Sequence, residues 1–333
     1  MKSQAITLCM LAAMWTPAVL SAKDINVTPS TFAETWASAS DGDVLLMESG
    51  NYEAALTLQS GKTITLKAAA DATVVLQQGP SAAEDCADAG LILDGLTIHL
   101  RKGDHFMRFC AQSIRTLEFR NCIIEEVPRC FFNATCNTVI DNITFKDCII
   151  RECGTKGYCF IWSKASIKKL TVEGCTLYNY LDGESFFYQS NRRSGINIEF
   201  TFCNNTVSRW GIGDGDTMPF VNVADMFGRD SKYVFSNNLF IKSSISANKP
   251  NVITVASGTV TAENNLVVGF GDYNTSGGAT KSVTDLSADE LKLADGEPGF
   301  TNADAGDFTL PAKSPLRKAG TDKQPVGDPR WAR

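Results

Sequence analysis

A short strand-rich unit recurs along this chain and restricts its fold more than any other feature. Seven segments place an apolar, alternating run before an Asn, Asp or Gly and a second apolar run after it. The residues at these seven turns are Asp94, Asn121, Asp147, Gly174, Asn204, Asn237 and Asn264, with spacings of 27, 26, 27, 30, 33 and 27. A repeat this short, with no helical stretch between its strands, excludes sheets built with crossover helices. The spacing predicts stacked coils of a parallel β-helix.

Each predicted coil contains three strands. Asn, Asp and Gly recur at the turn because a sharp bend between strands requires a left-handed backbone, which these residues tolerate best. A further β-rich run precedes each turn, at 105–109, 130–133, 159–162, 186–189, 220–223 and 252–255. Coils stack at about 4.8 Å, so the seven turns and one earlier coil near Ile64 predict a rod of roughly 35–40 Å.

Both ends of such a rod need a cover, because unpaired strand edges recruit other chains. Thr31 and Glu34 have capping-box spacing and predict a short helix to about Ala39. Ser287 to Glu290 repeats the pattern near the other end, and the Gly-, Pro- and Asp-rich tail after Asp295 is predicted to pack along or over the last coil. The predicted organisation is a parallel β-helix with an N-terminal cap over 23–284 and a C-terminal capping helix and tail over 285–333.

The N-terminus and the composition limit the location and the partners of the chain. Residues 1–22 carry Lys2, then an uncharged run ending in AVLSA, which is typical of a signal peptide cleaved after Ala22. We therefore expect an exported protein, either periplasmic, on the cell surface or secreted. No later apolar run is long enough to span a membrane. A net charge of −6 argues against a nucleic-acid partner, and two histidines, His99 and His105, make a zinc hydrolase improbable.

The cysteines follow the same repeat. Cys122, Cys148 and Cys175 fall 26 and 27 residues apart just after the turn, and Cys110 and Cys136 begin a second column. Equivalent side chains on neighbouring coils are about 4.8 Å apart, which exceeds the Cβ separation of about 3.8 Å that a disulfide prefers. We therefore predict buried, reduced thiols in these columns. Any disulfide is expected among the cysteines outside them, namely Cys86, Cys130, Cys153, Cys159 and Cys203.

The chain resembles the pectate-lyase-like superfamily of right-handed parallel β-helix proteins. The resemblance rests on TFAETWASASDGDVLLMESGNYEAALTLQSGKTITLKA at 31–68, the NNLF-type turns, and EPGFTNADAGDFTLPAKSPLRKAGT at 297–321. Such segments are similar to those of secreted β-helix proteins from polysaccharide-degrading Bacteroidetes. The resemblance covers nearly all of residues 24–330 and implies an all-β fold. It is specific for the fold rather than for one activity.

In that superfamily, polysaccharide lies along the outer face of the first strand of each coil, so the resemblance implies a binding surface here. The residues expected on this face are Arg108, Asn133, Trp162, Tyr188 or Gln189, Asn222 and Thr254. The bordering loops add Arg209 and Trp210, and Trp162, Tyr188 and Trp210 could stack on sugar rings. The in/out register of these strands is left open by the sequence.

A uronate lyase needs a base that removes the C5 proton and a group that neutralises the sugar carboxylate. SKAS at 163–166 loosely resembles a strand end of chondroitinase-B-like and alginate lyases, which implies Lys164 as the base. Those enzymes carry Arg-His-Gly one coil later, where this chain has Tyr188-Gln189-Ser190-Asn191, and Arg192 and Arg193 are candidate substitutes. Solvated turn charge is the alternative role for these three cations. The candidate calcium ligands are Asp182, Glu184, Asp214 and Asp216.

Two functions remain open from the sequence. One is an exported β-helix that binds polysaccharide, acidic or neutral, along its first-strand face without catalysis. The alternative is a calcium-assisted polysaccharide lyase acting by β-elimination. The missing Arg-His-Gly favours binding, and the basic residues near the same face favour the lyase.

Overall fold

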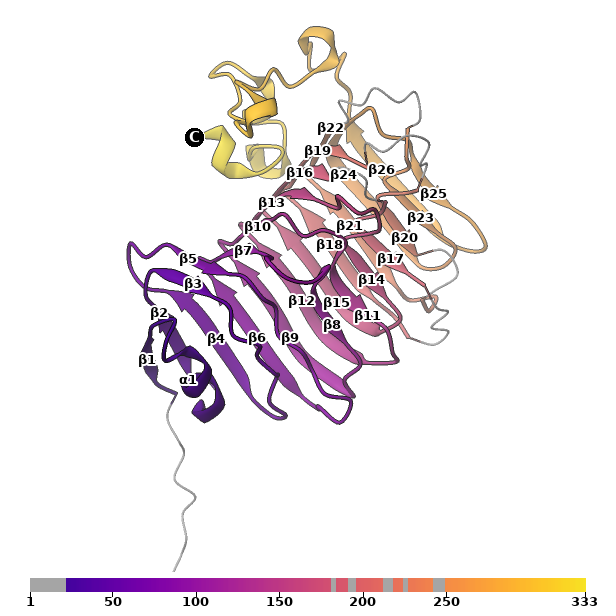
Figure 1. Ribbon diagram of the computed structural model, residues 1–333. Coiled ribbons are helices and arrows are strands. Elements are labelled where there is room, and N and C mark those ends of the chain that lie inside the picture. Colours follow the sequence, from indigo (N-terminus) through magenta and orange to yellow (C-terminus); the bar gives the residue numbers. More distant parts are fainter. Residues whose placement is uncertain (1–21, 181–183, 191–195, 212–217, 224–226, 242–248) are drawn as a thin grey trace, which may run out of the picture.

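The chain winds into successive coils that stack along one axis. The computed structural model describes residues 22–180, 184–190, 196–211, 218–223, 227–241 and 249–333. Each strand pairs in parallel with its equivalents one coil before and one coil after, as Figure 1 shows. This arrangement confirms the predicted right-handed parallel β-helix.

The strands form three columns, which we name by their order within a coil. The leading column contains β8 (His105–Phe109), β11 (Cys130–Ala134), β14 (Ile161–Ser163), β17 (Phe187–Gln189), β20 (Val221–Val223), β23 (Ile253–Val255) and β25 (Tyr273–Thr275). The middle column contains β1 (Asp24–Val27), β2 (Val44–Met47), β4 (Thr63–Ala68), β6 (Ala89–Asp94), β9 (Ser113–Arg120), β12 (Val139–Lys146), β15 (Ser166–Glu173), β18 (Glu199–Cys203), β21 (Lys232–Ser236), β24 (Thr259–Val268) and β26 (Thr280–Leu286). The trailing column contains β3 (Gly50–Tyr52), β5 (Val74–Leu76), β7 (Thr97–His99), β10 (Ile123–Glu125), β13 (Ile149–Cys153), β16 (Thr176–Tyr180), β19 (Thr206–Trp210) and β22 (Leu239–Ile241), and the end of β24 extends it.

The turn between middle and trailing strands has the left-handed backbone that the sequence predicts. Its residues have φ between 52° and 62° in six coils, at Asn121, Asp147, Gly174, Asn204, Asn237 and Asn264. In the first of the seven, the left-handed residue is Gly95 (φ 76°) rather than Asp94. Asp94 instead ends β6, because the adjacent glycine adopts the positive φ at lower cost.

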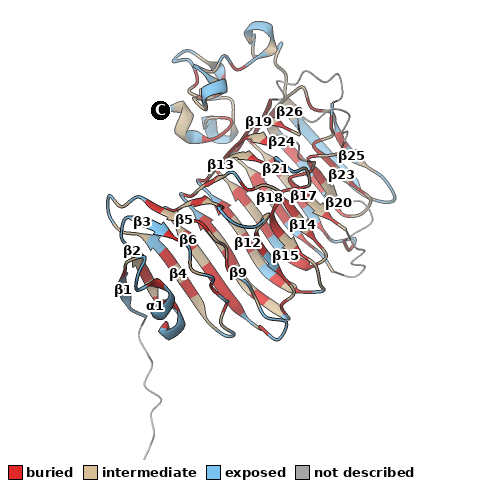
Figure 2. Cartoon of the chain, viewed as in Figure 1, coloured by how far each residue is buried: buried red, intermediate tan, exposed pale blue. Residues whose placement is uncertain are grey.

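Side chains alternate between the interior and the surface along most strands, as the red and tan bands of Figure 2 show. An aromatic stack runs through five coils of the interior beside the leading column. Its members are Phe106, Phe131, Phe160, Phe186 and Phe220, with successive ring centroids 4.5, 5.0, 5.5 and 5.3 Å apart. These distances are close to the coil spacing of about 4.8 Å, so identical residues can pack coil on coil.

A second internal stack lies just after the turn and changes chemistry along the rod. Its first part is the predicted thiol column, in which Cys122, Cys148 and Cys175 are free and buried. It continues as a chain of amides, in which Asn205 Nδ2 donates to Asn238 Oδ1 (3.2 Å) and Asn238 Nδ2 donates to Asn265 Oδ1 (2.7 Å). This buried amide ladder is one position beyond the turn residues Asn204, Asn237 and Asn264.

Asp285 ends the amide ladder and gives the fold a testable pH dependence. Its Oδ1 accepts from Asn265 Nδ2 (2.7 Å) and its Oδ2 from the Tyr273 hydroxyl (2.7 Å). Burial nevertheless raises the pKa of Asp285 above that of an exposed aspartate. Between the unfolded pKa, about 3.9, and the raised folded pKa, the folded state binds more protons, so the free energy of unfolding falls as pH rises.

We expect Asp285→Asn to remove this fall, because an amide can keep both hydrogen bonds without titrating. Urea midpoints measured across the acidic range should then show a variant whose advantage over the native protein grows with pH and becomes constant near neutrality. If the urea midpoints of the two proteins instead change in parallel with pH, Asp285 does not titrate in the acidic range.

A helix covers the N-terminal end of the rod, as predicted. Helix α1 (Phe32–Ser38) buries Phe32 and Trp36, and Trp36 Nε1 donates to the Thr57 carbonyl (2.9 Å). The capping-box bond itself is not made, since the Thr31 hydroxyl accepts from Thr28 N (3.1 Å). Within the described part of the chain, no helix is long and apolar enough to cross a membrane.

The C-terminal tail is irregular, as predicted, but the predicted capping helix is not formed within 285–333. Residues after Ser287 form a hydrogen-bonded turn rather than a helix, with Leu291 N donating to the Ser287 carbonyl (3.0 Å). The tail then runs back over the trailing column, beside β13 to β22 in Figure 1, instead of covering the last strand β26. It contains five short 3-10 turns, η1 (Ala294–Gly296), η2 (Ala303–Ala305), η3 (Pro315–Arg317), η4 (Thr321–Lys323) and η5 (Pro329–Ala332). Outward-facing apolar residues of β22 and β24, in contact with the tail, explain this path.

One cysteine prediction is wrong. Cys110 and Cys136 form a disulfide although they belong to a column that was expected to stay reduced. Their Cα atoms are 4.9 Å apart, within the usual range for disulfides. Strand pairing between β8 and β11 ends at Phe109 and Ala134, so these two side chains are no longer held parallel by the sheet. Of the remaining described cysteines, Cys86, Cys130, Cys153, Cys159 and Cys203 are free.

Candidate surface on the leading column

One outward row runs along the leading column and fixes the register that the sequence left open. Strand pairing places Arg108 beside Asn133, Asn133 beside Trp162, and Trp162 beside Tyr188. The row continues through Asn222 and Thr254 to Asn274, which the sequence analysis did not identify. We call this set, Arg108, Asn133, Trp162, Tyr188, Asn222, Thr254 and Asn274, the outer row.

The outer row has two adjacent aromatic residues near its centre. Trp162 and Tyr188 are partly exposed, whereas the residues on either side of each in β14 and β17 are buried. Lys164 Nζ lies 5.4 Å from the Trp162 ring, and the Tyr158 ring centroid is 6.1 Å from that of Trp162. The centre of the row therefore combines aromatic faces with a cation at its edge.

Polar groups lie on both sides of this aromatic pair. Asn133 Nδ2 and His105 Nε2 are 3.3 Å apart. Asn133 Oδ1 and Thr254 Oγ1 are buried and have no hydrogen-bond partner among the described residues. Buried polar atoms without a partner are costly, so the row contains two groups whose hydrogen-bonding capacity is unmet. Beyond Arg108, a recess contains Lys102 and His105.

Three of the predicted binding residues do not lie on this surface. Gln189 points inward, is fully buried, and donates from Nε2 to the Ala165 carbonyl (3.1 Å), because it alternates with Tyr188 along β17. Arg209 lies on the trailing column, where its guanidinium contacts Asp304 and the Ala303 carbonyl in the tail. Neither residue is available to a ligand on the outer row.

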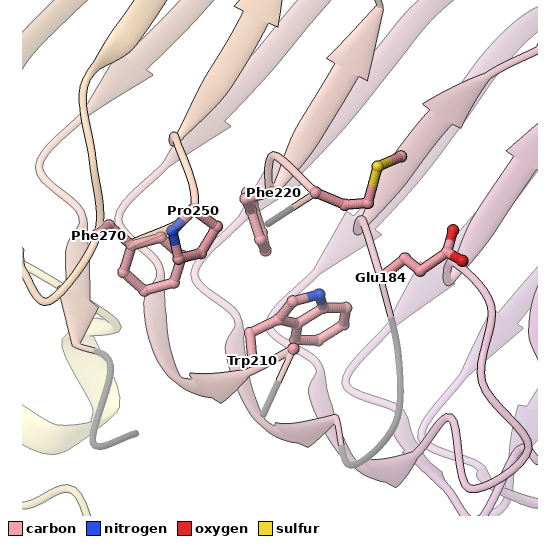
Figure 3. A pocket seen from close by; sticks show the side chains of 7 residues that line it. Glu184, Trp210, Phe220, Pro250 and Phe270 are labelled. Carbon is pink, nitrogen blue, oxygen red and sulfur yellow. The ribbon is translucent and has the colours of Figure 1, made fainter. Parts of the chain in front are cut away.

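Trp210 is a core residue rather than an exposed platform. Its ring stacks on Tyr180 with centroids 4.3 Å apart, and only 2% of the residue is exposed. It borders a small pocket with Phe220, Pro250 and Phe270, shown in Figure 3. The carboxylate of Glu184 lies on the opposite side of this pocket from Phe270.

A second left-handed position explains why Arg209 and Trp210 depart from expectation. Four residues at equivalent places have φ between 51° and 55°: Glu126 just after β10, and Glu152, Asn179 and Arg209 one residue before the ends of β13, β16 and β19. The chain bends there and Trp210 turns inward after Arg209. Glu and Arg are uncommon at positive φ, so the residue types gave no signal of this bend.

The candidate catalytic and metal groups are only partly within the described residues. Lys164 lies at the edge of the outer row, next to Trp162. Arg192, Arg193, Asp182, Asp214 and Asp216 lie outside the described residues. Among the residues that are described, no three His, Cys, Asp or Glu side chains converge in a way that could hold a metal ion. The calcium prediction therefore stays a prediction.

Two family models match the sequence in adjoining parts. Residues 50–180 match a domain of unknown function, DUF4957, and residues 170–331 match a second domain of unknown function, DUF5123. Neither description names an activity. Among curated proteins, none matches the sequence significantly.

Solved structures of similar fold include polysaccharide lyases. The PL6-family alginate lyase AlyGC has a TM-score of 0.54 and 18% identity over 82% of this chain, and this chain spans 42% of that lyase. The pectate lyase Pel9A gives a TM-score of 0.43 and 15% identity, covering 92% of this chain and 96% of that one. The similarity to AlyGC is one of fold. The chain is a parallel β-helix of the kind that this polysaccharide lyase uses.

Proposed function

We propose that this protein is exported and binds a polysaccharide along the outer row. The observation that carries the proposal is the pairing of Trp162 with Tyr188 on adjacent strands at the centre of an outward polar row. Aromatic faces stack on sugar rings, and the flanking amides and hydroxyls match sugar hydroxyls. Successive residues of the row are about 4.8 Å apart, close to the length of one sugar in an extended chain.

Acidic polysaccharide is the preferred ligand class. Arg108 at one end of the row and Lys164 beside Trp162 bring positive charge to a protein whose net charge is −6. Uronate carboxylates would meet these cations, while the net negative charge of the chain would disfavour non-specific binding of polyanions. The signal-peptide pattern of residues 1–22 supports export, where such polymers are met.

Binding to polygalacturonate, alginate and glycosaminoglycans, measured by calorimetry, tests the proposal. Trp162→Ala is expected to weaken binding about thirtyfold, since central aromatic residues commonly contribute about 2 kcal/mol or more. Trp162→Phe should retain most of the affinity. Lys168→Ala, on the exposed face of β15, is the matched control and should bind like the native protein.

Equal affinity of Trp162→Ala and the native protein would place any binding elsewhere on the surface. Absence of binding to all acidic polymers, together with binding to neutral ones, would retain the outer row but reject the acidic ligand class.

The second candidate function is a polysaccharide lyase, and the position of Lys164 favours it. Its Nζ lies on the same face as Trp162, so a base at Lys164 would be beside a sugar stacked on that ring. In this proposal Lys164 removes the C5 proton, with Arg192 or Arg193 as alternative bases, and Asp182, Glu184, Asp214 and Asp216 hold calcium against the uronate carboxylate.

Lyase action is tested by the ultraviolet absorbance of unsaturated uronate products, with and without calcium. A lyase with Lys164 as base would lose product formation in Lys164→Ala while still binding polymer. If the native protein binds polymer but forms no unsaturated product, the lyase function is rejected and binding without catalysis is retained.

A further inference from the structure

A pair of thiols lies beside the outer row, with Cys130 at the start of β11, which carries Asn133, and Cys159 two residues before β14, which carries Trp162. Pairing between β11 and β14 joins Phe132 to Ile161 and Asn133 to Trp162, an offset that places Cys130 opposite Cys159. Both cysteines are free and fully buried. Each thiol affects the pKa of the other.

The surroundings of Cys130 favour its thiolate. His105 pairs with Cys130 across β8 and β11, and Arg129 precedes it in sequence. Hydrogen bonds from Cys159 and His105, with the charge of Arg129, overcome burial and lower the pKa of Cys130 to about 7. The pKa of Cys159 is raised by burial and by its neighbour, as expected when one thiol donates its proton to the other.

The thiol column after the turn provides an internal comparison. Cys122, Cys148 and Cys175 are also one coil apart and buried. Burial and neighbouring thiols raise the pKa of Cys148 well above the usual value. A protonated thiol reacts poorly with disulfides, so proximity alone does not make that column reactive.

We propose that Cys130 and Cys159 are a redox-active pair that closes to a second inter-coil disulfide in an oxidising medium. The existing Cys110–Cys136 bridge joins neighbouring coils just beyond the β8–β11 pairing, with Cα atoms 4.9 Å apart. Cys130 and Cys159 likewise lie outside the β11–β14 pairing, which begins at Phe132 and Ile161. Disulfides persist in oxidising compartments, and the proposal does not depend on glycan binding. The new bridge would tie together the starts of β11 and β14, next to Asn133 and Trp162.

The reaction is a thiol–disulfide exchange with a small disulfide such as oxidised glutathione. The Cys130 thiolate attacks one glutathione sulfur and expels a glutathione thiolate. The Cys159 sulfur then attacks the Cys130 sulfur of the mixed disulfide, expels the second glutathione and transfers its proton to it. Two electrons pass from the protein to glutathione.

Access to the pair requires local opening. The guanidinium of Arg129 lies 5.2 Å from the Tyr158 ring centroid, and these residues immediately precede Cys130 and Cys159. Tyr158 has φ 96°, an unfavourable conformation for a residue with a side chain. Displacement of this strained residue would open a route for the oxidant to reach the thiols.

The test uses the folded full-length protein, incubated in oxidised glutathione, alkylated in denaturant, digested with trypsin and analysed by mass spectrometry. Trypsin places Cys110 in 109–115, both Cys130 and Cys136 in 130–146, and Cys159 in 157–164. We expect one species that joins all three peptides. Chymotrypsin, which cleaves after Phe132, should then separate the Cys130–Cys159 link from the Cys110–Cys136 link.

The matched control is Cys159→Ser, which should yield the two-peptide species of 109–115 with 130–146, carrying glutathione on Cys130 because no thiol resolves the mixed disulfide. In the native protein, peptide 157–164 alkylated at Cys159 after prolonged incubation would overturn the proposal. Equal formation of a link between 121–129 and 147–151, which contain Cys122 and Cys148, would overturn the argument that the local environment selects the pair.

Discussion

Asn238→Ala is expected to lower the free energy of unfolding by about 3 kcal/mol or more. Asn238 Nδ2 donates to the Phe202 carbonyl (2.8 Å) and to Asn265 Oδ1, while its Oδ1 accepts from Asn205 N (2.9 Å) and Asn205 Nδ2. The side chain is fully buried. Alanine would therefore remove four hydrogen bonds from the interior, including the acceptor of Asn205 N, and each buried group left unsatisfied costs about 1–3 kcal/mol.

Chemical denaturation followed by circular dichroism measures this loss. The matched control is Asn142→Ala, in which Nδ2 donates to the Thr116 and Thr144 hydroxyls (3.1 Å each) on the partly exposed face of β12. Water can replace these bonds, so we expect Asn142→Ala to lower the free energy of unfolding by less than about 1 kcal/mol. Similar losses in the two variants would mean that water reaches the amide ladder.

Much of the fold follows from local residue choices repeated at coil spacing. Asn121, Asp147 and Asn204 tolerate a left-handed backbone, and each is flanked by runs that alternate between apolar and polar residues. Both signals act within a few residues, so one sequence is enough to reveal them. The leading strands were predicted for the same reason.

Which side chains face outward was harder to predict, because a shift of the strand register by one residue turns every side chain to the opposite face. Tyr188 and Gln189 were equivalent candidates in the sequence, yet only Tyr188 faces outward. Arg209 and Trp210 were expected in a loop. The unpredicted positive φ of Arg209 instead directs Arg209 outward to the tail and Trp210 into the interior of the coils.

Long-range contacts of the tail could not be predicted either. Arg209 meets Asp304, and Thr176 meets Asp328, at separations of 95 and 152 residues. Neither residue belongs to a repeat that would indicate its partner. His105 was counted only as a scarce histidine, and its place opposite Cys130 follows from pairing between β8 and β11.

Leu316→Ala is expected to release the C-terminal tail from the trailing column. Leu316 is fully buried in an apolar cluster with Leu310 and Val326 of the tail and Leu239 and Ile241 of β22. Removing a buried leucine side chain typically costs about 2–5 kcal/mol, since a cavity remains. A cost near 3 kcal/mol raises the population of the detached tail by about two orders of magnitude.

Limited trypsin digestion of the folded protein measures this release. The tail contains Lys313, Arg317, Lys318 and Lys323, and cleavage at these sites should accelerate about a hundredfold if detachment is fast compared with proteolysis. Val283→Ala, which truncates an exposed residue of β26, should leave the rate unchanged.

Cleavage within the β-helix at the same accelerated rate would show that the tail and coils unfold together. Polar contacts of the tail argue that it detaches as a unit: Trp331 Nε1 donates to Thr176 Oγ1 (2.6 Å), which in turn donates to Asp328 (2.6 Å). These bonds join the tail to the outer side of the trailing column, whereas the coils are held by their own ladders and internal stacks. Loss of Leu316 therefore weakens a contact that the coils do not need for their pairing.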